Sequence, residues 1–162
     1  MADIRQSMAQ AQVTRALCVC TTLEEFEDVY SLAASYDNFW ASAGVHPDNE
    51  GVREPSVQDL IELSQHPKVV AIGETGLDYY DMGGRKGGRS IADMQWQRER
   101  FRVHIRAARQ SGLPLIIHTR SASEDTLAIL REEGGFASAS GASASGASAG
   151  GQGTQTSPAT GV

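Results

Sequence analysis

Short apolar runs alternate with amphipathic segments along most of this chain, and this alternation restricts the possible folds more than any other feature. The apolar runs cover residues 16–20, 38–45, 69–71 and 115–117, and each is followed by a segment with helical spacing of apolar residues. Parallel strands joined by helical crossovers produce this order. The sequence therefore predicts an α/β fold with about four βα units.

Capping residues bound several of the expected helices. A hydroxyl group at Thr21 or Thr22 predicts a helix start, and Ser90 with Asp93 predicts a capping box. Ser123 predicts the cap of a final helix. Gly112 predicts a left-handed helix end. The expected helices cover residues 3–14, 22 to about 35, 57–64, 94–111 and 124–132.

Ionisable side chains stand at the ends of successive predicted strands. His46 follows the second apolar run, Glu74 the third and His118 the fourth, and Gly73 and Gly76 on either side of Glu74 permit a tight turn. The carboxyl ends of parallel strands share one edge of a sheet, where such folds place their sites. We therefore expect Glu74 in the loop after its strand and His118 at the end of the next strand, close to His46. Taken alone, the Glu74 segment is also compatible with an ordinary solvated turn.

Charge and cysteine content limit the class of protein. The net charge of −6 argues against general nucleic-acid affinity, although basic residues gather between Arg85 and Arg120. That segment is either a solvated helix face or a surface that contacts phosphate. Cys18 and Cys20 are too close for a relaxed disulfide, so they are either small core residues or a thiolate pair for a metal.

The N-terminal segment and the hydropathy of the chain indicate where in the cell the protein resides. No apolar run approaches the roughly 20 residues that a membrane-spanning helix needs. Residues 1–12 lack the apolar stretch of a secretory signal peptide. We expect a cytoplasmic protein that does not enter a membrane.

Four motifs, in this order, resemble those of the TatD family of metal-dependent hydrolases. The similarity covers about residues 3–134, and the motifs are Gly44-Val45-His46-Pro47, Ile72-Gly73-Glu74-Thr75-Gly76-Leu77-Asp78-Tyr79-Tyr80, Gln97 with Phe101, and Pro114-Leu115-Ile116-Ile117-His118-Thr119-Arg120-Ser121-Ala122. The resemblance implies a (β/α)8 TIM barrel of the amidohydrolase-like type. It also implies two divalent metal ions of the Mg, Mn or Zn type and hydrolysis of phosphodiesters, with deoxyribonuclease activity as the usual assignment.

The resemblance also assigns candidate site residues. Glu74 matches the family's metal-bridging glutamate, and His118 matches a metal-binding histidine. His46 and Arg120 match motif positions near the site and are candidates for substrate contact, since a planar guanidinium suits phosphate oxygens. No catalytic residue is assigned. Asp78 is either a structural turn residue or a residue that orients a ligand.

The chain departs from the family pattern at both ends. Family members begin with a strand that ends in a His-x-His pair, which is absent here, and they use a further histidine and an aspartate from later strands. After Gly135 the sequence becomes an Ala/Ser/Gly tract. We therefore expect a partial barrel over residues 1–135 and a disordered low-complexity tail over residues 136–162. Our hypothesis is a fragment without the first strand and the last three, produced by a frame change or an aberrant gene model, with impaired metal binding.

Three functional hypotheses remain open. The first is a TatD-like hydrolase acting on DNA or another phosphodiester, weakly active or inactive as a fragment. The second is a non-catalytic remnant or binding module. The third is a related hydrolase that acts on a small phosphoester or an amide. None of the three implies a stable protein partner.

Overall fold

The computed structural model describes residues 2–82, 84 and 87–136 of the 162-residue chain. Apart from Phe136, the tail for which we predict disorder lies outside these residues. Within the described residues the chain forms four strands, five α-helices and one 3-10 helix.

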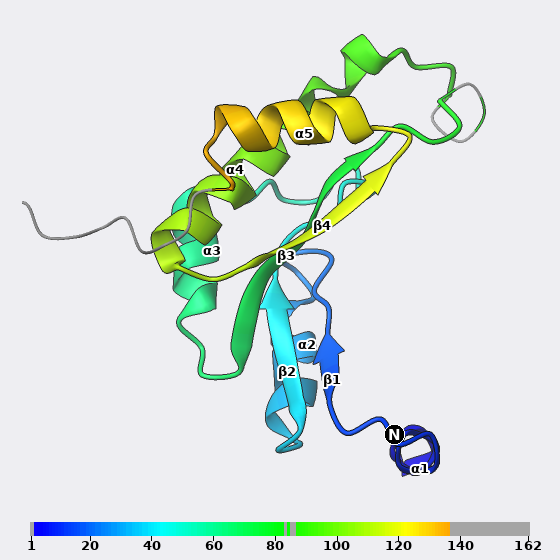
Figure 1. The fold of residues 1–162 in the computed structure, drawn as a ribbon, viewed down its shortest axis with the longest axis vertical. Coiled ribbons are helices and arrows are strands. Elements are labelled where there is room, and N and C mark those ends of the chain that lie inside the picture. The colour runs from blue at the N-terminus through cyan, green and yellow to red at the C-terminus, as the bar shows by residue number, and fades with distance from the viewer. Residues whose placement is uncertain (1, 83, 85–86, 137–162) are drawn as a thin grey trace, which may run out of the picture.

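The central element is a sheet of four parallel strands in the order β1-β2-β3-β4. Figure 1 shows that the sheet is strongly twisted and curls into a half-barrel. This arrangement confirms the predicted α/β fold with about four βα units. The strands are β1 (Ala16–Cys18), β2 (Phe39–Ala43), β3 (Val69–Asp78) and β4 (Leu115–Arg120).

Helices alternate with these strands, and those that follow β1 pack on one face of the sheet (Figure 1). The capping box of Ser90 and Asp93 is formed and precedes a short 3-10 helix, and Gly112 ends the longest helix at a φ of 73°. The helices are α1 (Ala2–Gln10), α2 (Phe26–Ala34), α3 (Val57–Ser64), η1 (Ile91–Met94), α4 (Gln95–Ser111) and α5 (Ser123–Glu132).

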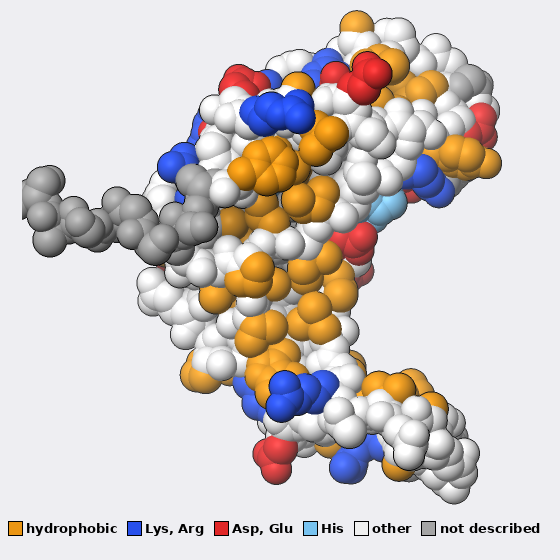
Figure 2. Space-filling view, in the orientation of Figure 1, with side chains coloured by type: hydrophobic (Ala, Val, Ile, Leu, Met, Phe, Trp, Pro, Cys, Tyr) orange, Lys and Arg blue, Asp and Glu red, His pale blue; other side chains and the backbone are white. Residues whose placement is uncertain are grey.

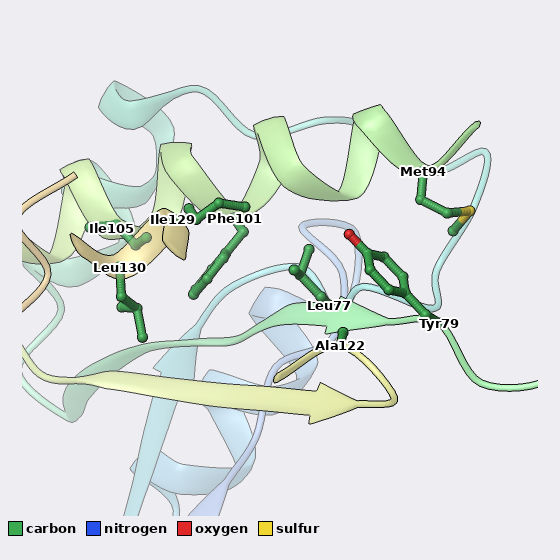
Figure 3. Packing of buried hydrophobic residues seen from close by; sticks show 8 residues of the cluster. All are labelled: Leu77, Tyr79, Met94, Phe101, Ile105, Ala122, Ile129 and Leu130. Carbon is green, nitrogen blue, oxygen red and sulfur yellow. The ribbon is translucent and has the colours of Figure 1, made fainter. Parts of the chain in front are cut away.

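The core lies between the sheet and these helices. Figure 3 shows one of its clusters, in which Leu77 of β3 packs with Phe101 and Ile105 of α4 and with Ile129 and Leu130 of α5. Burial of these apolar side chains fixes α4 and α5 against β3 and β4. This packing therefore holds the carboxyl ends of β3 and β4 in place.

The third and fourth strands are longer than predicted, and this corrects the expected position of two site residues. Glu74 lies inside β3 rather than in a following loop, because Gly73 and Gly76 adopt φ angles of 138° and 132°. The pairing with β4 shifts register between Ile72 and Thr75 and then continues to Asp78. His118 consequently lies inside β4 rather than at its end.

Gly76 is required for this continuation. A Cβ atom at this position would lie 2.0 Å from the carbonyl oxygen of His118 on the neighbouring strand. No side chain fits such a distance, so glycine here permits β3 and β4 to remain paired beyond the irregularity.

Several helix and strand ends also differ from the predictions. Thr22 Oγ1 accepts a hydrogen bond from the Glu25 amide, but this bond closes a turn, and α2 begins only at Phe26. Ser123 is the first residue of α5 and does not cap it, since Ala122 occupies the cap position. In addition, α1 ends at Gln10, and β1 and β2 are shorter than their apolar runs.

Both cysteines are free, and they belong to the core. Cys20 is fully buried in a cluster with Phe26, and Cys18 packs against the same cluster. Burial raises the pKa of both thiols. The core interpretation is thereby favoured over a thiolate metal pair.

From Arg89 to Arg120, most arginines of the basic segment pair with acidic neighbours, and Arg85 and Lys86 lie outside the described residues. Arg106 pairs with Glu133 at 2.6 Å, and Arg102 pairs with Glu132 at 2.8 Å, so α4 and α5 are linked across their exposed sides. Arg100 is buried and pairs with Glu54. This pattern favours an ion-paired helix surface over a surface that contacts phosphate.

In the part of the chain that the structure describes, no helix has both the length and the apolar character that crossing a membrane requires. The cytoplasmic location stays a prediction.

Candidate metal centre

Three of the predicted site residues come together at the carboxyl ends of the strands. His46 follows β2, Glu74 lies in β3 and His118 lies in β4. One potential ligand atom of each residue lies within 4.8 Å of the other two. Figure 2 shows histidine and carboxylate atoms side by side at the surface near this end of the sheet.

Asp78 determines which nitrogen of His118 faces this cluster. The Asp78 side chain is fully buried, and its Oδ2 lies 3.1 Å from His118 Nε2. A carboxylate accepts hydrogen bonds, so Nε2 carries the imidazole proton. In this tautomer His118 Nδ1 is the nitrogen with the free lone pair, and it lies 3.5 Å from Glu74 Oε1.

His46 has the opposite arrangement. The backbone N–H of Asp48 donates to His46 Nδ1 at 3.1 Å, so the proton of the neutral ring resides on Nε2. This Nε2–H lies 3.3 Å from His118 Nδ1 and 3.9 Å from Glu74 Oε1. Burial is the main cause that lowers the pKa of His46, and the neighbouring His118 lowers it further, because two imidazolium charges so close together would repel. The neutral form of His46 is thereby favoured. His46 thus presents a hydrogen-bond donor to the cluster.

The residues fit one divalent cation between Glu74 and His118. Glu74 Oε1 and His118 Nδ1 both carry lone pairs directed at this position, with the His46 Nε2 atom 3.9 Å and 3.3 Å away from them, and a cation between the two acceptors would attract both. Ligands bound at about 2.0–2.1 Å in tetrahedral geometry lie about 3.3 Å apart, close to the 3.5 Å between Glu74 Oε1 and His118 Nδ1. A nitrogen and carboxylate donor set suits Zn²⁺ or Mn²⁺ and also admits Mg²⁺.

Three successive turns of α4 hold the segment that carries His46. Gln97 Nε2 donates to the Pro47 carbonyl at 2.8 Å, and Arg100 Nη1 donates to the His46 carbonyl at 2.7 Å. One turn later, His104 Nε2 accepts from the Val45 amide at 3.0 Å. We call these three side chains of α4 the α4 ladder. It fixes the backbone at the end of β2.

His104 is a fully buried, packed residue. Its Nδ1–H donates to the Arg100 carbonyl at 2.8 Å, so both ring nitrogens have partners in the neutral form. Burial lowers the pKa of His104 to about 4. The ring is therefore a neutral structural element.

The sequence did not lead us to predict the contact between Arg100 and His46 or the second hydrogen bond of Gln97. Gln97 Oε1 also accepts from the Asp78 amide at 2.9 Å, which ties β3 to the end of β2. The available signal was the spacing of residues 97, 100 and 104, which places polar side chains on one buried face of a helix.

Arg120 joins the same network. Its Nη2 donates to Asp78 Oδ2 at 2.6 Å, and its guanidinium lies 4.5 Å from the centre of the Tyr80 ring. The Asp78 carboxylate raises the pKa of Arg120. Arg120 Nε is one of two buried side-chain polar atoms of the described residues that have no hydrogen-bond partner, the other being Thr75 Oγ1. Asp78 thus contacts both His118 and Arg120, and its Oδ1 also accepts from the Tyr80 amide at 3.0 Å, so both interpretations of this residue have support.

The family model described as TatD related DNase matches residues 1–142 of the chain. The chain belongs to this family. Among curated relatives, it is 42% identical over 132 residues to the uncharacterized metal-dependent hydrolase YcfH of Escherichia coli K12, a match that covers 81% of this chain and 46% of the relative. It is 33% identical to the 3'-5' ssDNA/RNA exonuclease TatD of Salmonella typhimurium, with 79% and 46% covered.

A solved structure supports the same conclusion for the fold. The TatD homologue YJJV from Escherichia coli K12 superimposes with a TM-score of 0.68 at 27% identity, covering 79% of this chain and 48% of YJJV. The chain spans about half the length of the relatives it matches. The fold is therefore that of a TIM-barrel hydrolase of the TatD type, represented here by four strands.

Proposed function

We propose that this TatD family chain forms a divalent-metal site for the hydrolysis of phosphodiester bonds in single-stranded nucleic acid. The observation that carries the proposal is the pair of potential ligand atoms, Glu74 Oε1 and His118 Nδ1, that face each other at 3.5 Å. The name of the Salmonella relative, a 3'-5' ssDNA/RNA exonuclease, supports this substrate class.

Each residue has a distinct task in this proposal. Glu74 and His118 hold the cation, and Asp78 keeps His118 in the tautomer that can bind it. A bound divalent ion would supply a Lewis acid and would acidify water at this position. His46 donates its Nε2–H to a phosphate oxygen, which retains the predicted substrate contact. Arg120 lies beside the site with a buried Nε–H that lacks a protein acceptor, and it adds positive charge near the phosphate.

We propose one ion for this chain rather than the two that the family resemblance implies. His46, Glu74 and His118 form the one such cluster of potential metal ligands among the described residues. Glu74 and His118 are the two ligands in this proposal. Two protein ligands bind a metal ion weakly, because closed or catalytic sites use three or four. We accordingly propose weak activity for this chain, with residues 1–135 as its partial barrel.

Calorimetric titration with Mn²⁺ or Zn²⁺ tests the metal site directly. We expect one ion per chain, and we expect Glu74→Gln to lower the affinity at least tenfold. Glu27→Gln is the matched control, since Glu27 lies exposed on α2. Equal affinity of both variants would refute the assignment of Glu74.

Hydrolysis assays separate the functional alternatives. Labelled single-stranded DNA and a small phosphoester are incubated in parallel with the metal-loaded protein. Cleavage of the DNA supports the proposal, and cleavage of the small ester alone supports a related hydrolase. Metal binding without cleavage of either substrate supports a non-catalytic remnant.

A further inference from the structure

Tyr80 places an aromatic ring beside the candidate metal centre. The residue is the second after the end of β3, and its amide donates to Asp78 Oδ1 at 3.0 Å. The Arg120 guanidinium covers one face of the ring, 4.5 Å from the ring centre, and Tyr80 is nevertheless 48% exposed. Single exposed apolar residues are common on protein surfaces, so the contacts of this ring decide what it can do.

One carboxylate connects the ring to the metal centre. Asp78 Oδ2 lies 3.1 Å from His118 Nε2 and accepts from Arg120 Nη2 at 2.6 Å. A single oxygen atom therefore lies between the proposed metal ligand and the guanidinium that covers the ring. A nucleic-acid strand with one phosphate at the cation can thus reach Tyr80 with an adjacent base.

We propose that the open face of the Tyr80 ring stacks on a nucleobase of single-stranded nucleic acid, with Arg120 supporting the ring from behind. This inference rests on the proposed function, because it names the part of that substrate which Tyr80 binds. The bases of a single strand can turn toward a protein, whereas those of a duplex are paired and stacked. Stacking selects single strands without reading their sequence, since every base has an aromatic face.

Arg120 prepares the ring for this contact. Its ion pair with the buried Asp78 and its position over Tyr80 hold the two side chains together before a ligand arrives. An aromatic side chain that is already held loses little conformational entropy on binding. The net charge of −6 also disfavours binding by general phosphate attraction, so contacts with uncharged bases gain importance.

Binding of two strands of equal length, an oligothymidylate and an abasic oligodeoxyribose phosphate, tests the proposal. Both strands carry the same phosphates, and only the first carries bases. Fluorescence anisotropy with the full chain in the absence of divalent metal measures binding without cleavage. We expect the wild-type protein to bind the thymidylate about tenfold more tightly. Equal binding of the two strands, or no binding of either, would overturn the proposal.

Variants at two exposed aromatic positions locate the contact. Tyr80→Leu removes the ring and should abolish the tenfold preference for the strand with bases, whereas Tyr80→Phe keeps the ring and should retain it. Phe136→Leu is the matched control, because Phe136 is 63% exposed and lies beyond α5, which runs back from the tip of β4 (Figure 1). Far-UV circular dichroism verifies that each variant is folded. An unchanged preference in Tyr80→Leu would refute the assignment.

Arg120→Lys tests the support of the ring. Lysine keeps the positive charge but has no planar group to lie against the ring, so the preference should fall about threefold. Full retention of the preference would refute the supporting role of Arg120. None of these measurements uses metal or hydrolysis. Cleavage of DNA without a preference for bases would therefore refute this inference alone, and a preference for bases without cleavage would support it and refute the proposed hydrolysis.

Discussion

The Nε2 atom of His118 lies 3.1 Å from Oδ2 of the fully buried Asp78. Through this contact the buried Asp78 determines the tautomer of His118, whose side chain reaches the surface. The nitrogen turned toward Glu74 is thereby the unprotonated one, as metal ligation requires.

Substitution Asp78→Asn should weaken metal binding about 10–100-fold, because an amide also donates hydrogen bonds and no longer imposes one tautomer on His118. Titration with Zn²⁺ measures the effect. Asp28→Asn, at an exposed position of α2, serves as the control and should bind as the wild type does. Unchanged affinity of Asp78→Asn would show that His118 does not depend on this carboxylate.

Substitution His46→Ala should lower the turnover of single-stranded DNA about 100-fold, the effect of removing one hydrogen-bond donor to developing negative charge. Metal affinity should change little, since His46 presents its protonated nitrogen to the cluster. Kinetics and metal titration on the same preparation measure both quantities. A tenfold or larger loss of metal affinity would identify His46 as a ligand instead.

The buried His104 should make folding stability depend on pH. Its pKa is about 4 in the folded protein and 6.5 in the unfolded chain, so between these values the unfolded chain binds the extra proton. The His104 contribution is complete above pH 6.5 and is lost as the pH falls toward 4, by about 3 kcal/mol in total.

Urea unfolding at several pH values between these limits measures this contribution. His104→Gln removes the titrating group, so the free energy of unfolding should vary less steeply with pH in this variant. Parallel pH profiles for the two proteins would contradict the assignment.

Substitution Gly76→Ala should destabilise the fold by about 3 kcal/mol or more, since a methyl group there meets the His118 carbonyl oxygen and the φ of 132° disfavours a side chain. Gly51→Ala is a matched control, because Gly51 also has a positive φ but has no heavy atom within 4 Å of an added Cβ. It should cost about 1–2 kcal/mol. Thermal or urea unfolding distinguishes the two costs, and equal costs would exclude the steric explanation.

The sequence was sufficient for the order of the elements and for the gathering of His46, Glu74 and His118. Apolar runs of strand length and helical spacing are local signals, and the carboxyl ends of parallel strands meet for geometric reasons. The metal-binding role of these residues stays a proposal.

The extension of β3 and β4 was not predictable from local signals. Gly73 and Gly76 are typical of a turn, and only the partner strand shows that they accommodate an irregularity instead. The buried positions of Arg100 and Asp78 depend on distant partners, Glu54 and His118. Their charges predict exposure, and tertiary pairing overrides that expectation.

The α4 ladder connects residues that are 50 to 59 positions apart in the sequence. The backbone that carries His46 is therefore not held by its own βα unit alone. It is fixed only after a later helix has docked, so a polypeptide that stops before that helix would contain the histidine and its strand but would lack the three side chains that hold their backbone.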